Sequence, residues 1–173
     1  MNKALSLAAA ATLSCASLNS EAQTMIGKTT DVAAIAKGDR MNAETLWAMG
    51  RIGGAAASPD GKTVVYQVGY YSVKQNKSHQ MLYTVSADGK KQHSLTTTAA
   101  SESDATWIDG GKRIAFLTGG QLWSMNADGT DRRQLTKSEI DIEGYIFSPD
   151  EKKVILIKSL PYHCLLYTSD AAD

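Results

Sequence analysis

A segment of about 40 residues recurs along this chain of 173 residues. Residues 82–89, LYTVSADG, recur 40 positions later as LWSMNADG, and the Leu-Thr pair at 95–96 recurs at 135–136. An ASPDGK motif at residues 57–62 has relatives 50 and 90 positions further on, WIDGGK and FSPDEK. A fixed period of this length indicates a protein built from stacked copies of one supersecondary unit.

The hydrophobic pattern within each copy has a period of two. Short runs rich in β-branched and aromatic residues at 63–68, 113–117 and 153–157 each follow a turn signal, which predicts strands. Asp-Gly pairs at 88–89 and 128–129 fit tight hairpin turns. Four short antiparallel strands in about 40 residues are typical of a β-propeller blade. We therefore expect an all-β fold, an incomplete β-propeller of two to three four-stranded blades, with a flat sandwich as the alternative.

The repeat also predicts where the blades lie. We expect a partial propeller over residues 54–163, with blades at about 54–99, 100–139 and 140–163, the last one truncated. The first blade carries about ten extra residues around 69–78. Propellers typically need four to eight blades to close. An open array of two and a half blades would expose an apolar face and strand edges, and we expect it to aggregate or to be partly molten.

Both ends of the chain carry signals unrelated to the repeat. Residues 1–22 read as a secretory signal peptide, with Lys3, a short apolar stretch and a small-x-small cleavage site. The stretch is too short to span a membrane, so we expect a cleaved signal and a periplasmic or secreted protein, with acylation of Cys15 as the alternative. Residues 23–53 would form a leader. Residues 164–173 match a translated sequencing-library adapter, and we expect the natural sequence to end near His163.

Charge and polar side chains exclude several functions. The 18 basic and 18 acidic residues balance, so the sequence shows no basic footprint for a nucleic acid. The basic pairs 90–91 and 132–133 are expected at solvated hairpin tips. His79 and His93 have no further ligand at metal-binding spacing, and we expect them to be exposed. Residues 126–131 resemble part of a calcium loop, but their spacing favours a turn. We expect no metal site and no cofactor.

A short helix expected at residues 41–52, with Asn42 as its N-cap, leads directly into the SPDGK motif and the first strand. This order resembles the start of the exported prolyl-oligopeptidase-type serine peptidases, which include dipeptidyl-peptidases and acylaminoacyl-peptidases. The resemblance covers residues 41–163. TolB-like periplasmic propellers carry similar SPDGK repeats, so a non-enzymatic propeller that serves as a protein-binding platform is the alternative.

The resemblance implies a propeller that gates and positions short peptides beside a C-terminal α/β-hydrolase domain with a Ser-Asp-His triad. The chain contains no Gly-x-Ser-x-Gly motif, and none of its residues is assigned a catalytic role. Tyr70 and Tyr71 lie in the insertion of the first blade and are the candidates for substrate contact, because loops that interrupt a repeat often share one functional face. Trp107 and Phe147 are expected to pack between blades. The sequence leaves the oligomeric state open.

Overall fold

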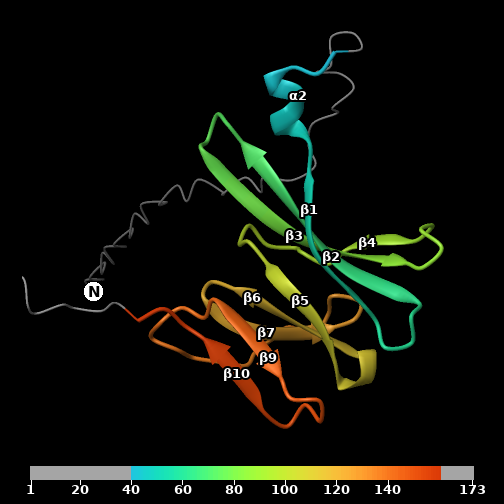
Figure 1. The fold of residues 1–173 in the computed structure, drawn as a ribbon, viewed down its shortest axis with the longest axis vertical. Helices are drawn as coiled ribbons and strands as arrows, with labels where there is room; N and C mark the ends of the chain where they lie inside the picture. Colours follow the sequence, from blue (N-terminus) through green and yellow to red (C-terminus); the bar gives the residue numbers. More distant parts are fainter. Residues whose placement is uncertain (1–39, 161–173) are drawn as a thin grey trace, which may run out of the picture.

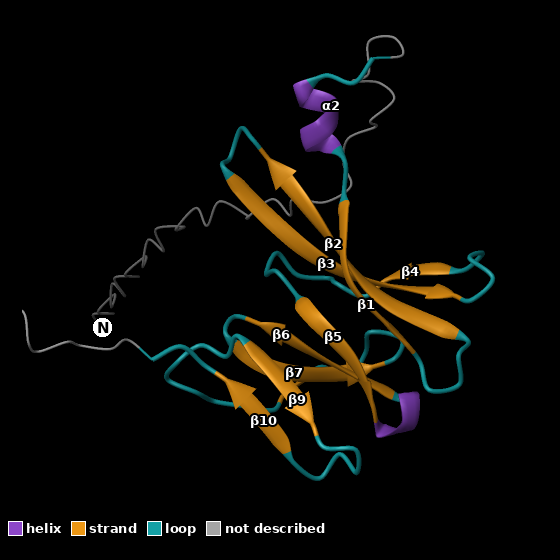
Figure 2. Cartoon of the chain, viewed as in Figure 1, coloured by secondary structure: helices purple, strands orange, loops and turns teal. Residues whose placement is uncertain are grey.

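The computed structural model describes residues 40–160. The predicted signal peptide, most of the leader, Cys15, His163 and the adapter-like residues 164–173 lie outside the described residues. A short helix precedes ten strands that form three antiparallel sheets (Figures 1 and 2). The helix is α2 (Ala43–Ala48).

Each of the first two sheets has four strands that neighbour one another in chain order. The first sheet consists of β1 (Arg51–Ala57), β2 (Thr63–Ser72), β3 (Lys77–Ser86) and β4 (Gln92–Ser94). The second consists of β5 (Ser103–Ile108), β6 (Arg113–Thr118), β7 (Gln121–Asn126) and β8 (Arg133–Gln134), with a 3₁₀ turn, η1 (Asp109–Gly111), between β5 and β6. The third sheet pairs β9 (Gly144–Phe147) with β10 (Val154–Ile157).

The all-β, incomplete propeller fold is confirmed by these sheets. We call them blades 1, 2 and 3 in chain order. Blade 2 lies between the other two, and β6 is buried on both of its faces: Ile114 and Phe116 face blade 1, whereas Ala115 and Leu117 belong to the cluster shared with blade 3. Alternate residues of a strand point to opposite faces, so a doubly covered strand is apolar throughout.

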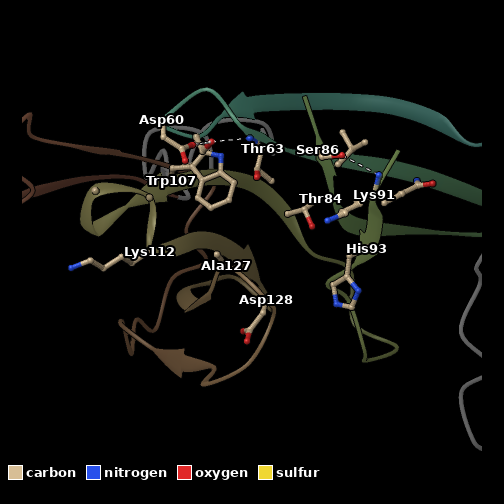
Figure 3. Close-up of a pocket in the computed structure, with 15 residues that line it drawn as sticks. Asp60, Thr63, Thr84, Ser86, Lys91, His93, Trp107, Lys112, Ala127 and Asp128 are labelled. Atoms are coloured by element: carbon tan, nitrogen blue, oxygen red, sulfur yellow. Dashed lines mark hydrogen bonds between the residues drawn. The ribbon is translucent and has the colours of Figure 1, made fainter. Parts of the chain in front are cut away.

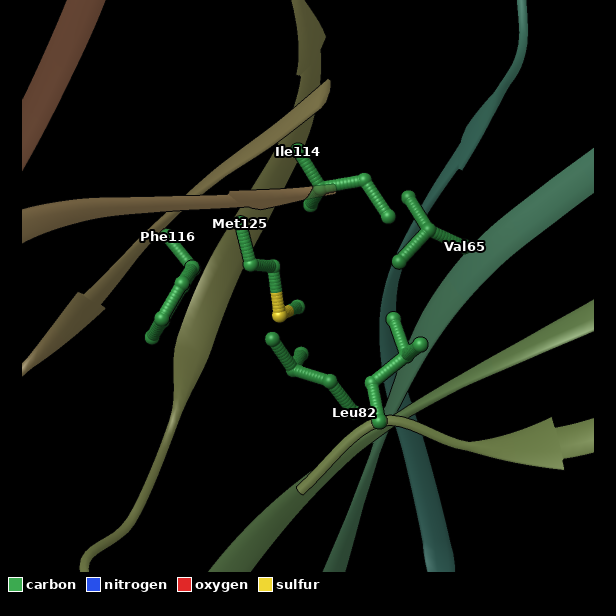
Figure 4. Close-up of a cluster of buried hydrophobic side chains, with 6 residues drawn as sticks. Val65, Leu82, Ile114, Phe116 and Met125 are labelled. Atoms are coloured by element: carbon green, nitrogen blue, oxygen red, sulfur yellow. The ribbon is translucent and has the colours of Figure 1, made fainter. Parts of the chain in front are cut away.

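The contact between blades 1 and 2 forms the main core. Six buried side chains, three from each blade, meet there (Figure 4): Val65, Leu82, Leu95, Ile114, Phe116 and Met125. Trp107 packs against this core as expected, and its indole N–H donates to the carbonyl of Ala56 in blade 1 over 2.9 Å. Phe147 packs against the second cluster, between blades 2 and 3.

The recurring Leu-Thr pair has the same structural role in both complete blades. The Thr96 hydroxyl accepts from the amide of Leu82 at 2.7 Å, and the Thr136 hydroxyl accepts from the amide of Leu122 at 2.9 Å. The leucine before each threonine pairs with the same residue: the amide of Leu95 donates to the carbonyl of Leu82, and the amide of Leu135 donates to that of Leu122. The threonine hydroxyl thus continues the pairing of the third strand after the short fourth strand has ended.

The recurring Ser-x-Asp motif closes turns at one end of the blades. In the turn after β1, the Ser58 hydroxyl donates to the Asp60 carboxylate at 2.6 Å and accepts from the amide of Thr63 at 3.0 Å. Ser148 and Asp150 repeat these bonds after β9. The motif at Ser86, after β3, makes the same bonds in a turn to the outermost strand. These turns lie at one end of the sheets, which we call the turn end, and we call the other end the hairpin end.

Candidate functional site

The insertion in blade 1 lengthens a hairpin. Strands β2 and β3 have ten residues each, against six each in β6 and β7, and the turn at the tip spans residues 73–76. Tyr70 pairs with His79 and Tyr71 with Ser78, so both tyrosines lie in a strand and not in a loop. The expectation of a loop is wrong because the inserted residues continue the β-favouring pattern of β2 up to Ser72.

The two tyrosines are consecutive and point to opposite faces of the hairpin. Tyr70 is half-buried, and its hydroxyl lies 3.2 Å from that of Tyr83. Burial, followed by this hydrogen bond, raises the pKa of Tyr70 above the ordinary value for tyrosine. Tyr71 keeps 38% of its surface exposed and lies edge-on to Trp47 of α2, with ring centroids 6.0 Å apart. Tyr71 is therefore the one of the pair that a ligand can reach.

Helix α2 has a side-chain cap at its start and is followed by a close backbone approach to this hairpin. As predicted, Asn42 is the N-cap, and its side chain accepts from the amide of Thr45 at 2.7 Å. The helix is shorter than the expected 41–52, since Met49 is already extended and β1 begins at Arg51. A side chain at Gly50 would lie 2.8 Å from Val68 and 2.9 Å from Tyr70. Glycine thus lets the chain cross the hairpin closely.

Helix α2 lies beside the end of the β2–β3 hairpin, at the top of Figure 1, and residues of both line a groove at the hairpin end. Its volume is about 410 Å³. We call it the hairpin groove; its lining residues are Trp47, Tyr71, Ser72, Val73, Asn76, Lys77 and Ser78. It combines aromatic walls, several hydroxyl and amide groups and one ammonium group. That composition suits a small polar ligand with an apolar part.

A second cavity, of about 770 Å³, lies at the turn end between blades 1 and 2 (Figure 3). Charges of both signs line it: Asp60 and Asp128 are acidic, and Lys91 and Lys112 are basic. His93 lies here, exposed as expected, in β4. The lining residues come mainly from the turns between the strands of each blade, so this cavity follows from the packing of two repeated units.

Of two polar residues predicted to be exposed, His79 is buried and Arg132 is partly buried. His79 is 3% exposed, and its Nε2 lies 3.1 Å from the carbonyl of Ala100, in the link between blades 1 and 2. Arg132 is not at a solvated tip: its guanidinium pairs with the fully buried carboxylate of Glu102 and lies 4.9 Å from the Phe116 ring centroid. The two basic pairs are not equivalent in position. Lys90 comes directly after the Asp-Gly pair at 88–89, whereas two residues separate Arg132 from the Asp-Gly pair at 128–129.

Glu102 is the buried charge that sequence reasoning missed. Burial raises the pKa of Glu102, whereas the hydrogen bond from Thr96 and then the charge of Arg132 lower it. The Thr96 hydroxyl donates to this carboxylate at 2.8 Å. Because Glu102 is fully buried and paired, it fastens the link between blades to blade 2 and is closed to ligands.

The remaining features that could indicate a function are a metal site, the calcium-like segment at 126–131 and a membrane-spanning helix. Between residues 40 and 160, no three side chains of the metal-binding types gather into a cluster. The segment at 126–131 forms the turn between β7 and β8, where Asp128 accepts from the amide of Thr130 at 3.0 Å. Within the same described range, no helix has the length and apolarity needed to cross a membrane.

Comparison with known proteins agrees with this fold. The chain is 42% identical over 119 residues to Dipeptidyl-peptidase 5 of Porphyromonas endodontalis, a match that covers 66% of the chain and 17% of the relative. Dipeptidyl-peptidase 5 of Porphyromonas gingivalis is 40% identical over 129 residues, covering 72% and 19%. The chain therefore spans less than a fifth of the length of these relatives.

A solved acylaminoacyl peptidase, in complex with Z-Gly-Gly-Phe-chloromethyl ketone, superposes with a TM-score of 0.58 and 12% identity, covering 76% of this chain and 21% of that one. Models of known protein families give no match. Fold and relatives together confirm the resemblance to the prolyl-oligopeptidase-type serine peptidases. The described residues have the fold of part of a propeller.

Proposed function

We propose that this chain is the propeller part of an exported serine peptidase that cleaves short peptides. In the whole protein, the propeller gates and positions the peptide, and an α/β-hydrolase domain outside this chain supplies a Ser-Asp-His triad. The identity of 42% to a dipeptidyl-peptidase is the observation that carries this proposal. Release of dipeptides from the N-terminus of peptides is accordingly the reaction to test first.

The hairpin groove is the part of the propeller proposed to contact the peptide. It lies where the repeat is interrupted, and Tyr71 and Trp47 offer aromatic faces there. Tyr70 points to the other face of the strand and is not among the residues that line the groove. The predicted signal peptide supports the proposal that the protein is periplasmic or secreted. Peptides and the hydrolase domain are the proposed partners, with no nucleic acid among them and the oligomeric state left open.

The activity is tested on the full-length protein, recovered from genomic DNA with this sequence in its reading frame. We expect it to release methylcoumarin from dipeptidyl-methylcoumarinamides and to lose this activity on labelling with a fluorophosphonate, which acts on activated serines. Mass spectrometry of a cleaved hexapeptide should show dipeptides leaving from the free N-terminus. A protein that neither reacts with the fluorophosphonate nor cleaves any peptide would refute the proposal.

The proposed contact is tested with tyrosine variants of the same protein. Replacing both Tyr70 and Tyr71 by alanine should raise KM for peptide substrates several-fold. Tyr71→Ala alone should account for most of that rise, because Tyr71 lines the groove. The control is Tyr70→Phe, which keeps the ring and loses only the hydroxyl paired with Tyr83. An unchanged KM in the double variant would remove the groove from substrate binding.

A further inference from the structure

Among residues 40–160, Arg51 forms no ion pair with an acidic side chain. It is the first residue of β1, and its guanidinium carbon lies 5.0 Å from the centroid of Trp47 and 4.4 Å from that of Tyr71. The ion pairs among residues 40–160 involve Lys90, Arg113, Arg132 and Arg133, and Arg51 is in none of them. Arg51 is an exposed residue, and its guanidinium lies over two aromatic rings.

The surroundings of Arg51 are cationic. Residues 61–87, which contain the whole hairpin, include no Asp or Glu, and Lys74 and Lys77 lie at its tip. Lys77 also lines the hairpin groove. The one acid in α2 is Glu44, and no ion pair links it to these groups within the described residues. Aspartates gather instead at the turn end, at positions 60, 88, 128 and 150.

We propose that the hairpin groove is a carboxylate-recognition site: Arg51, which packs against the Trp47 and Tyr71 rings at the edge of the groove, receives a carboxylate of a peptide bound there. A guanidinium presents a planar fork of N–H donors that matches a carboxylate with two parallel hydrogen bonds. Contact with two aromatic rings whose planes lie 61° apart restricts the guanidinium before the ligand arrives, so less side-chain entropy is lost on binding. Lys77, which lines the groove, adds a positive charge to that of Arg51 at its edge.

This site rests on the proposed peptidase function only in one respect, namely that the bound peptide is a substrate or a product of the enzyme. Binding itself is measurable without turnover. A carboxylate could come from the C-terminus of a peptide or from an acidic side chain, and both would use the same donors. An anionic membrane surface would also attract the basic hairpin, but two aromatic walls and a groove of about 410 Å³ favour a ligand the size of a few amino acids.

The test uses the full-length protein and four acetylated tetrapeptides that end in Glu or Gln, each as the free acid and as the amide. Titration calorimetry gives the dissociation constants, and mass spectrometry checks that the peptides stay intact. We expect at least one carboxylate form to bind about tenfold more tightly than the Gln amide, a difference typical of a charge-assisted hydrogen-bonded pair. The free-acid Gln peptide and the Glu amide show which carboxylate is preferred.

Variants of the same protein place the effect at Arg51. Arg51→Met should abolish the preference for the carboxylate, and Arg51→Lys should restore it only in part, because an ammonium group cannot form the planar fork. Arg133→Met is the matched control: it removes one arginine charge from β8, far from the groove in sequence and paired with Asp131, and should change binding less than twofold.

Three results would overturn this site while leaving the peptidase proposal intact. They are equal binding of all four peptides, an unchanged preference in Arg51→Met, and binding only to phosphatidylserine vesicles. Conversely, a carboxylate preference in a protein that cleaves no peptide would support the site and refute the peptidase. Unfolding midpoints of the variants within about two degrees of the parent protein show that the fold is retained.

Discussion

Serine hydroxyls set the ionisation of the turn aspartates. The hydrogen bond from Ser58, followed by the amide of Lys62, lowers the pKa of Asp60, and Ser148 and the amide of Lys152 act likewise on Asp150. A carboxyl group whose pKa is lower in the folded state stabilises that state above its unfolded pKa, and this contribution is lost as the pH falls through the folded pKa. The turn end of the blades should therefore be weakened by acid.

Ser58→Ala should raise the pKa of Asp60, because it removes the first of the causes that lower it. A proton-detected NMR titration of the Asp60 side chain between pH 2 and 6 measures this directly. Ser148→Ala is the control, since it alters the equivalent turn of blade 3 and should leave Asp60 unchanged. An unaltered titration of Asp60 in Ser58→Ala would mean that the hydroxyl has no such effect.

Arg132 and Arg133 are neighbours in sequence with opposite surroundings. Arg132→Met would leave the fully buried Glu102 carboxylate without its charge partner, a change that typically costs about 3–5 kcal/mol. Arg133→Met removes an exposed pair and should cost less than about 0.5 kcal/mol.

Hydrogen exchange of the Glu102 amide reports on this difference. That amide donates to the carbonyl of Gln80 at 3.0 Å, so it exchanges only when the link between blades 1 and 2 opens. In the full-length protein, its protection should fall sharply in Arg132→Met and stay constant in Arg133→Met. Equal protection in both variants would show that the buried pair contributes nothing to the link.

Helix α2 depends on the absence of a side chain at Gly50. Gly50→Ala would place a methyl group within 3 Å of Val68 and Tyr70, and overpacking of this kind typically costs about 1–3 kcal/mol. We expect α2 to move off the hairpin and the amide of Thr45 to lose its protection against exchange. Gly54→Ala is the control, because nothing lies within 4 Å of the methyl group there. Unchanged protection in Gly50→Ala would contradict the close crossing.

The repeat predicts the elements well where its own pattern continues. Turn signals at Asp60, Asp88 and Asp128 and the alternation of the strands were enough to predict blades, and Asn42 was identifiable as a cap because its side chain acts within one turn. The insertion was misread, because an added pair of strand segments and an added loop have the same length in a sequence.

The sequence did not allow us to predict which polar side chains are buried. Nothing local distinguishes His79 from His93, or Arg132 from Arg133, since their burial depends on which residues of the next blade lie opposite. Sequence reasoning missed the contact between Arg51 and two of the rings that line the hairpin groove for the same reason. Trp47, Arg51 and Tyr71 are separated along the chain and meet only once α2 folds back on the hairpin. An excess of lysine without acid in residues 61–87 was the one available signal.

At the scale of the whole molecule, blade 3 presents an uncovered apolar face. Ile146, Ile155 and Ile157 lie on one face of the β9–β10 pair, with 58%, 65% and 49% of their surfaces exposed. Tyr145 and Leu156 on the opposite face pack against blade 2. A further blade is what such a face packs against in a propeller.

The 173-residue chain, expressed alone, should therefore self-associate. Light scattering after size exclusion should show species larger than a monomer, and Ile155→Lys should reduce them by placing a charge on the open face. Lys153→Arg, on the same strand region but without a change of charge, is the control. A monomeric chain with a sharp, reversible thermal transition would contradict this expectation.

The central claim is that these blades belong to a larger propeller peptidase, and the DNA sequence downstream of the codon for Leu160 tests it most directly. The account predicts further SPDGK-type repeats, then a Gly-x-Ser-x-Gly motif, followed by the Asp and the His of a triad in that order. A reading frame that ends soon after the propeller is complete, with no such motif, would contradict it.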